Sequence, residues 1–132
     1  MSTKSPKLIV THTSAPFWNG IAEKRLMLQY DPGTGRYQFF PRPLGLHSTT
    51  PLEWRQASGK GTLVAFTLTH FVAPGFEDRV PYLEGVVRLD EGPRIFTALG
   101  GTTLQELNVG QRVQIVYGGD GHPFQFCPAP AE

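Results

Sequence analysis

The chain has one cysteine, no run of like charges and no long apolar segment, and each absence excludes a class of protein. Cys127 is the only cysteine among 132 residues, so an internal disulfide framework is excluded. Twelve Lys and Arg against eleven Asp and Glu give a formal net charge of +1, without the basic clusters typical of nucleic-acid-binding proteins. No apolar stretch approaches the roughly 20 residues that cross a bilayer, and MSTKSPKLIVTHTS lacks a signal-peptide core. We expect a soluble cytoplasmic protein.

Residues suited to catalysis do not gather in the sequence. Cys127 lies in the Pro-rich tail CPAPAE without a neighbouring base, so we do not expect its thiol to be activated. Asp90 and Glu91 look like paired carboxylates, but Gly92 and Pro93 follow them, which is typical of a hairpin turn. The sequence presents no acid, base and nucleophile constellation from which a reaction can be argued.

The first part of the chain predicts one helix. Ser14 followed by Pro16 is typical of a helix start, and Phe17, Trp18 and Ile21 then recur at the spacing of a helix of about ten residues. The aromatic side chains either pack against the rest of this chain or anchor a partner, because Trp and Phe are prominent at interfaces. The sequence leaves both interpretations open.

After the helix, the chain predicts a short strand and then a region of turns. Leu26, Leu28 and Tyr30 alternate as the residues of a strand do. Glycine and proline between residues 31 and 50 are too dense for a helix. Two short hairpin-like turns flanking residues 37–40 fit this composition.

The second half predicts five strands and one helical turn. Thr103 is a candidate cap for a turn that presents Leu104 and Leu107 between the third and fourth strands. Five strands in this order are typical of an OB-fold, a partly open Greek-key barrel. We expect the glycines of segment 58–61 to allow a bulge or bend in the first long strand. The predicted strands, rich in β-branched and aromatic residues, are 61–70, 82–89, 95–99, 112–117 and 124–127.

These segments together resemble the acyl-CoA-associated OB-fold proteins known as domain of unknown function 35. The resemblance covers residues 17–126, and it rests on the order and spacing of FWNGIAEKRLMLQ, RYQFFPRP, EWRQASGKGTLVAFTLTH, PGFEDRVPY, VVRLDEGPRIFTAL and LNVGQRVQIVY. It implies a mainly β fold with an N-terminal helix, a rubredoxin-like zinc ribbon and an OB barrel. The expected divisions are an N-terminal extension with the helix (1–29), a ribbon-like segment (30–52), the barrel (53–128) and a tail (129–132).

The sequence departs from that family at the ribbon. The four cysteine positions correspond to Asp31, Thr34, Gly45 and Ser48. Glycine has no side chain and neutral hydroxyls bind zinc poorly, so we expect no bound metal. The ribbon would then be ordered by packing of its own aromatic residues, by a partner surface, or by both.

The resemblance implies a partner instead of a reaction. Members of the family look like accessory subunits of thiolase-fold enzymes or acyl-CoA hydratases. We therefore expect a non-catalytic scaffold in a hetero-oligomer, with acyl-CoA as a candidate ligand of the complex and no other cofactor. Two alternatives stay open: an OB-type nucleic-acid-binding protein, which the balanced charge disfavours, and a self-sufficient acyl-CoA enzyme, which would need catalytic residues that we do not find.

Seven residues are candidates for contact with a partner or with acyl-CoA. Large apolar side chains on the helix and in the loop 71–81 can anchor a partner, and basic side chains near the turns can meet the phosphates of coenzyme A. The alternatives are packing within this chain for the former and simple solvation for the latter. The candidates are Phe17, Trp18, Lys60, Phe76, Arg79, Arg88 and Arg94.

Overall fold

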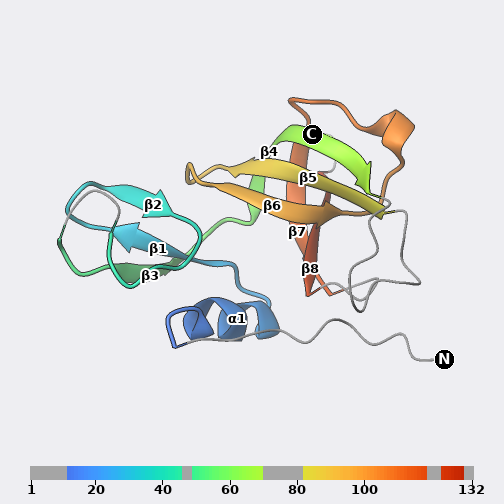
Figure 1. The fold of residues 1–132 in the computed structure, drawn as a ribbon. Coiled ribbons are helices and arrows are strands. Elements are labelled where there is room, and N and C mark those ends of the chain that lie inside the picture. The colour runs from blue at the N-terminus through green and yellow to red at the C-terminus, as the bar shows by residue number, and fades with distance from the viewer. Residues whose placement is uncertain (1–11, 46–48, 70–81, 119–122, 130–132) are drawn as a thin grey trace.

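The computed structural model describes residues 12–45, 49–69, 82–118 and 123–129. In these residues the chain forms one α-helix, a small three-stranded sheet and a closed five-stranded barrel (Figure 1). The loop expected at 71–81, with its candidates Phe76 and Arg79, and the ribbon position Ser48 lie outside the described residues.

Helix α1 spans Ala15–Ala22 and begins where the sequence predicted, with Ser14 at its N-cap and Pro16 in its first turn. It has eight residues instead of the expected ten or so. The helix ends early because Lys24 adopts a left-handed backbone conformation with φ of 61°, which an α-helix cannot continue through.

The small sheet consists of β1 (Met27–Asp31), β2 (Arg36–Gln38) and β3 (Glu53–Gln56), with β1 in the centre and both pairings antiparallel. The sequence-based division grouped residues 53–56 with the barrel, whereas the structure pairs them with β1. Nothing local in EWRQ specifies its partner, because a strand's sheet is set by pairing between distant segments.

The barrel confirms the predicted OB-fold. Its strand order is β4-β5-β6-β8-β7, and β7 pairs back onto β4 to close the sheet. The pairing of β6 with β8 is parallel and the other pairings are antiparallel. The strands are β4 (Lys60–Thr69), β5 (Tyr82–Leu89), β6 (Arg94–Leu99), β7 (Arg112–Tyr117) and β8 (Phe124–Pro128).

Two local features of the barrel agree with the sequence analysis. The 3₁₀ helix η1 (Leu104–Glu106) lies between β6 and β7, and Thr103 and Glu106 form a capping box at its start. Gly59, just before β4, has φ of 77°, which explains the glycine at the predicted bend. The register shift within β4 comes later, between Leu63 and Ala65.

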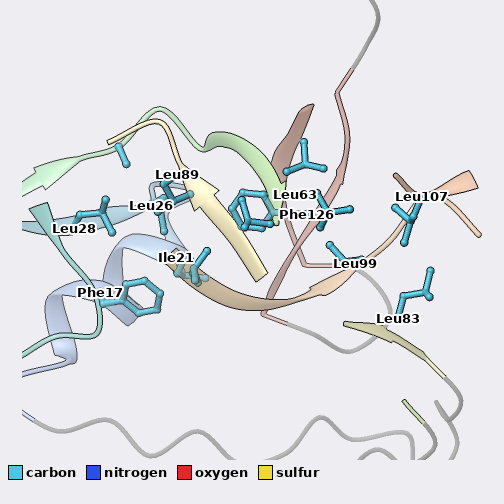
Figure 2. Packing of buried hydrophobic residues seen from close by; sticks show 14 residues of the cluster. Phe17, Ile21, Leu26, Leu28, Leu63, Leu83, Leu89, Leu99, Leu107 and Phe126 are labelled. Carbon is cyan, nitrogen blue, oxygen red and sulfur yellow. The ribbon is translucent and has the colours of Figure 1, made fainter. Parts of the chain in front are cut away.

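A single apolar core joins the three parts of the molecule (Figure 2). Leu63 and Phe126 are fully buried inside the barrel, while Phe17 from α1 and Leu26 and Leu28 from the first strand region extend the same cluster. The backbone N–H of Ala57 also donates to the Leu26 carbonyl, at 2.7 Å, where the chain passes from the sheet to the barrel. None of the described helices is long and apolar enough to cross a membrane.

Candidate binding surfaces

The outer side of β4, β5 and β6 is a continuous wall of the barrel (Figure 1). Because side chains alternate across a strand, the register sorts the outward positions into three rows that cross all three strands. We call this surface the arginine face. Its rows are Thr62, Arg88 and Arg94; then Ala65, Val86 and Phe96; then Thr67, Glu84 and Ala98.

The first row brings together two of the predicted candidates. Arg88 and Arg94 are direct cross-strand partners on β5 and β6, and both are exposed. Like charges directly opposite each other in a sheet are unfavourable. Within the described residues, neither side chain has an ion pair or a hydrogen bond that would offset this repulsion.

Two other basic residues near this row, Arg112 and Lys60, differ from Arg88 and Arg94 because they lie beside the acidic residue Asp90. Arg112 continues the first row on β7, and its Nη1 and Nη2 donate to Oδ1 and Oδ2 of Asp90, each at 2.8 Å. The hydrogen bonds from Arg112 lower the pKa of the Asp90 carboxyl, and the charges of Arg112 and Lys60 add to that effect. The predicted candidate Lys60 therefore lies beside a carboxylate, whereas Arg88 and Arg94 do not.

The second row of the arginine face is apolar. Phe96 is 63% exposed, and its cross-strand partner Val86 is half-buried. Phe96 lies two residues after Arg94 on the same strand, so their side chains leave the same side of the sheet about 7 Å apart along the strand. An exposed aromatic residue thus adjoins two basic side chains, an arrangement for binding that the sequence analysis missed because it did not single out Phe96.

The two aromatic candidates on α1 occupy different environments. Phe17 is only 1% exposed, and its ring lies 5.4 Å from that of Phe39 and 6.1 Å from that of Phe124. It therefore belongs to the core, as the packing interpretation predicted. Trp18 contacts Phe17 edge-on, with ring centroids 4.8 Å apart, and is half-buried.

Trp18 lines a pocket of about 360 Å³ between α1 and the adjoining ends of β7 and β8. We call it the apolar pocket; the other residues that line it are Ile21, Ala22, Lys24, Tyr117, Gly118 and Pro123. Burial raises the pKa of Tyr117, while a hydrogen bond with the backbone of Leu26 acts in the opposite direction. Tyr117 and Arg112 are at opposite ends of β7, roughly 17 Å apart, so the pocket and the arginine row occupy different ends of the barrel.

The ribbon positions do not fit a zinc site. Asp31 is 3% exposed, and its Oδ1 accepts a hydrogen bond from the N–H of Gly33 at 2.9 Å. Thr34 is neutral and Gly45 has no side chain, so neither provides a good ligand for zinc. In the described ranges, no group of three or more His, Cys, Asp or Glu side chains is placed to hold a metal ion.

Buried amides connect the strands of this segment instead. Gln29 Nε2 donates to the Arg42 carbonyl at 2.7 Å, and Gln29 Oε1 accepts from the Arg42 N–H at 2.8 Å. Gln38 Nε2 also donates to Gln29 Oε1, at 3.1 Å. Gln29 is 4% exposed and Gln38 is 8% exposed. Sequence analysis did not find this cluster, because a glutamine in a short strand is ordinarily a surface residue.

The barrel matches a known family of domains. Residues 54–118 match the family model described as the C-terminal OB-fold domain of ChsH2. A DUF35 domain-containing scaffold protein of Pyrococcus furiosus is 29% identical over 101 residues, which are 76% of this chain and 74% of that protein. The 3-oxo-4,17-pregnadiene-20-carboxyl-CoA hydratase alpha subunit of Mycobacterium tuberculosis is 29% identical over 106 residues, which are 79% of this chain but only 33% of that subunit.

Solved structures share the whole architecture. A chain of the Ltp2-ChsH2(DUF35) aldolase aligns with a TM-score of 0.80 at 23% identity, covering 92% of this chain and 98% of that one. A DUF35-family protein of unknown function from Sulfolobus solfataricus aligns with a TM-score of 0.65 at 14% identity, covering 91% and 87%. The fold defines this molecule as a helix and a small sheet attached to an OB barrel. Residues 54–118 are similar to the ChsH2-type OB-fold domain, and the chain resembles DUF35 proteins in sequence and in fold.

Proposed function

We propose that this chain is a non-catalytic accessory subunit that binds and positions an enzyme of acyl-CoA metabolism. A thiolase-fold enzyme or an acyl-CoA hydratase is the proposed partner, in a cytoplasmic hetero-oligomer. The observation that carries the proposal is the similarity of this chain to proteins that are named a scaffold protein and a CoA hydratase subunit, together with the family match of residues 54–118.

The prominent features of the described residues suit binding. The arginine face presents two arginines and an exposed phenylalanine, residue types that are enriched at protein interfaces. The Asp90 carboxylate forms hydrogen bonds with Arg112, and its pKa is lowered. Asp90 is therefore ionised at neutral pH, whereas a general acid must carry a proton.

We also propose acyl-CoA as a ligand of the complex, with no metal or other cofactor held by this chain. The apolar pocket supports this, because its volume of about 360 Å³ is in the range of small-ligand sites. Trp18 and Tyr117 provide apolar surface for an acyl group, and the ammonium of Lys24 at the lining would favour a negative charge.

The test is recovery of the partner from native cells. We would tag the chromosomal copy, so that the protein is made at its natural level, and identify co-purified proteins by mass spectrometry and their ratio by light scattering. The control is the same tag on an unrelated protein of similar abundance. The purified complex would then be assayed for turnover of acyl-CoA with and without this chain.

The outcomes separate the three functional classes. Recovery of a thiolase-fold enzyme or acyl-CoA hydratase at a fixed ratio, with no turnover by this chain alone, supports the accessory role. Acyl transfer, hydration or hydrolysis by the isolated chain would establish an enzyme and overturn the proposal. Recovery of nucleic acid without any enzyme would favour the OB-type nucleic-acid-binding alternative.

A further inference from the structure

The arginine face carries a local electrostatic cost. Arg88 and Arg94 are opposed across β5 and β6, while Asp90, two residues after Arg88, is engaged by Arg112. Glu84, in the third row, lies four residues before Arg88 on β5, with the outward residue Val86 between them. The uncompensated positive charge is thus concentrated at one end of the face. A negatively charged group placed there would relieve the repulsion between the two guanidinium groups.

The adjoining apolar row defines the shape of what binds. Phe96 is 63% exposed and adjoins Val86 and Ala65 in a row that crosses three strands. These side chains lie on the outside of a closed barrel, which is a convex surface. Small ligands bind in concave sites that enclose most of their surface, so a convex wall suits a macromolecular partner better.

The charge pattern favours a protein over a nucleic acid. Nucleic-acid-binding OB barrels line a groove with several aromatic and many basic residues, whereas this face has one exposed aromatic side chain, two unpaired arginines and an acidic residue, Glu84. An apolar centre with charged residues at its edge is the usual composition of a protein interface. Phe and Arg are both enriched at such interfaces.

We propose that the arginine face docks an acidic segment of a partner protein. In this arrangement a carboxylate of the partner pairs with Arg88 and Arg94 together, and an apolar side chain of the same segment packs on Phe96 and Val86. The inference rests on the proposed function in so far as the partner is the enzyme that this chain accompanies.

The first experiment identifies what covers the face in cells. Phe96 is replaced by the photo-crosslinking residue benzoylphenylalanine in the full chain, and crosslinked species are mapped by mass spectrometry after irradiation. Val109, which is 67% exposed between η1 and β7, is replaced in the same way as the control. We expect a specific crosslink from position 96 to an Asp- or Glu-containing segment of one protein, and none to that segment from position 109.

The second experiment measures the charge pairing. The double variant Arg88→Glu and Arg94→Glu should bind the crosslinked partner at least about 30-fold more weakly, since reversing charges that pair across an interface both removes attraction and adds repulsion. The matched control, Arg36→Glu with Arg42→Glu, makes the same change in net charge on exposed side chains away from the face. Changing the mapped carboxylates of the partner to Lys should restore binding to the first double variant.

The outcomes distinguish this inference from the proposed function. A crosslink to an acidic segment of a protein that is not an acyl-CoA enzyme would support the docking surface but contradict the proposed function. Co-purification of an acyl-CoA enzyme with no crosslink at position 96, or with equal binding by both double variants, would overturn the docking surface alone. A nuclease-sensitive crosslink, or no crosslink to any protein, would also overturn it.

Discussion

The side-chain amide of Gln29 pairs with both polar groups of Arg42's backbone, donating to its carbonyl at 2.7 Å and accepting from its N–H at 2.8 Å. These two hydrogen bonds join β1 to a segment 13 residues later. In a zinc ribbon the metal makes such a connection between knuckles. Here the neutral amide of Gln29 makes the connection. Its hydrogen bonds are strengthened by burial, because Gln29 is only 4% exposed.

Replacing this amide should destabilise the small sheet. Gln29→Leu keeps the approximate volume but removes the side-chain amide that pairs with the N–H and the carbonyl of Arg42, and it removes one hydrogen bond of Gln38. We expect a loss of about 2–3 kcal/mol in the free energy of unfolding, because a buried polar group left unpaired costs about 1–3 kcal/mol. Urea denaturation measures the change. Gln105→Ala, at an exposed position in η1, is the control and should change stability by less than about 0.5 kcal/mol.

Removal of metal should leave the fold intact. Asp31 is engaged by Gly33, and the other described ribbon positions are not zinc ligands. We therefore expect the circular dichroism spectrum and the melting temperature to be the same after extended dialysis against a strong chelator. Elemental analysis of the purified protein should find much less than one zinc per chain. A melting temperature that falls in chelator and returns on adding Zn²⁺ would contradict this.

Substitutions of Phe17 and Trp18 should differ in their effects on stability and on ligand binding. Phe17→Ala removes a side chain that is 1% exposed and packed between aromatic rings, so we expect a loss of about 3–5 kcal/mol. Trp18→Ala opens the half-buried wall of the apolar pocket and should cost clearly less, while weakening any ligand of that pocket. Thermal denaturation and acyl-CoA titration of both variants test this. Equal losses of stability in the two variants would contradict the expected difference between a buried and a half-buried ring.

The barrel could be predicted from sequence because its signals are local. Each strand is a run of β-branched and aromatic residues bounded by turn residues, and the predicted strand ends agree with the structure to within one residue. The turn after Leu89 also fixes the hairpin register, which is why two residues flanking it, Arg88 and Arg94, meet across the sheet.

The remainder depended on contacts between distant segments. Sequence spacing could not assign β3 to the small sheet, since its partner β1 lies more than 20 residues earlier. It also could not decide between the adjacent residues Phe17 and Trp18, because which one faces the core depends on where β8 and the segment after β2 pack. The exposure of Phe96 could not be predicted for the same reason, because it depends on how β6 pairs with β5, which places Phe96 on the outer side opposite Val86.

Loss of the Asp90–Arg112 pair should destabilise the protein only above acidic pH. The folded pKa of Asp90 is lowered below its unfolded value near 3.9, so its stabilisation is present above that value and is lost as pH falls through the folded pKa. Both side chains are largely exposed, at 41% and 51%, so we expect Asp90→Asn to cost no more than about 1 kcal/mol at pH 7. Urea denaturation from pH 7 to pH 2 should show the difference from the native chain shrinking to nothing. A difference that stays constant over this range would contradict the assignment.

Tyr117 should report on the apolar pocket at alkaline pH. Burial raises its folded pKa above the ordinary value near 10, because the phenolate is poorly solvated there. The neutral form is therefore favoured by folding, and this stabilisation is present below pH 10 and is lost as pH rises through the folded pKa. The titration is followed by NMR of the labelled ring carbons and assigned by its absence in Tyr117→Phe.

Because Tyr117 lines the pocket, an acyl-CoA that fills the pocket should exclude more water and raise the pKa of Tyr117 further. Trp18→Ala should abolish that additional shift. A ligand that binds the chain without moving this titration would have to bind elsewhere.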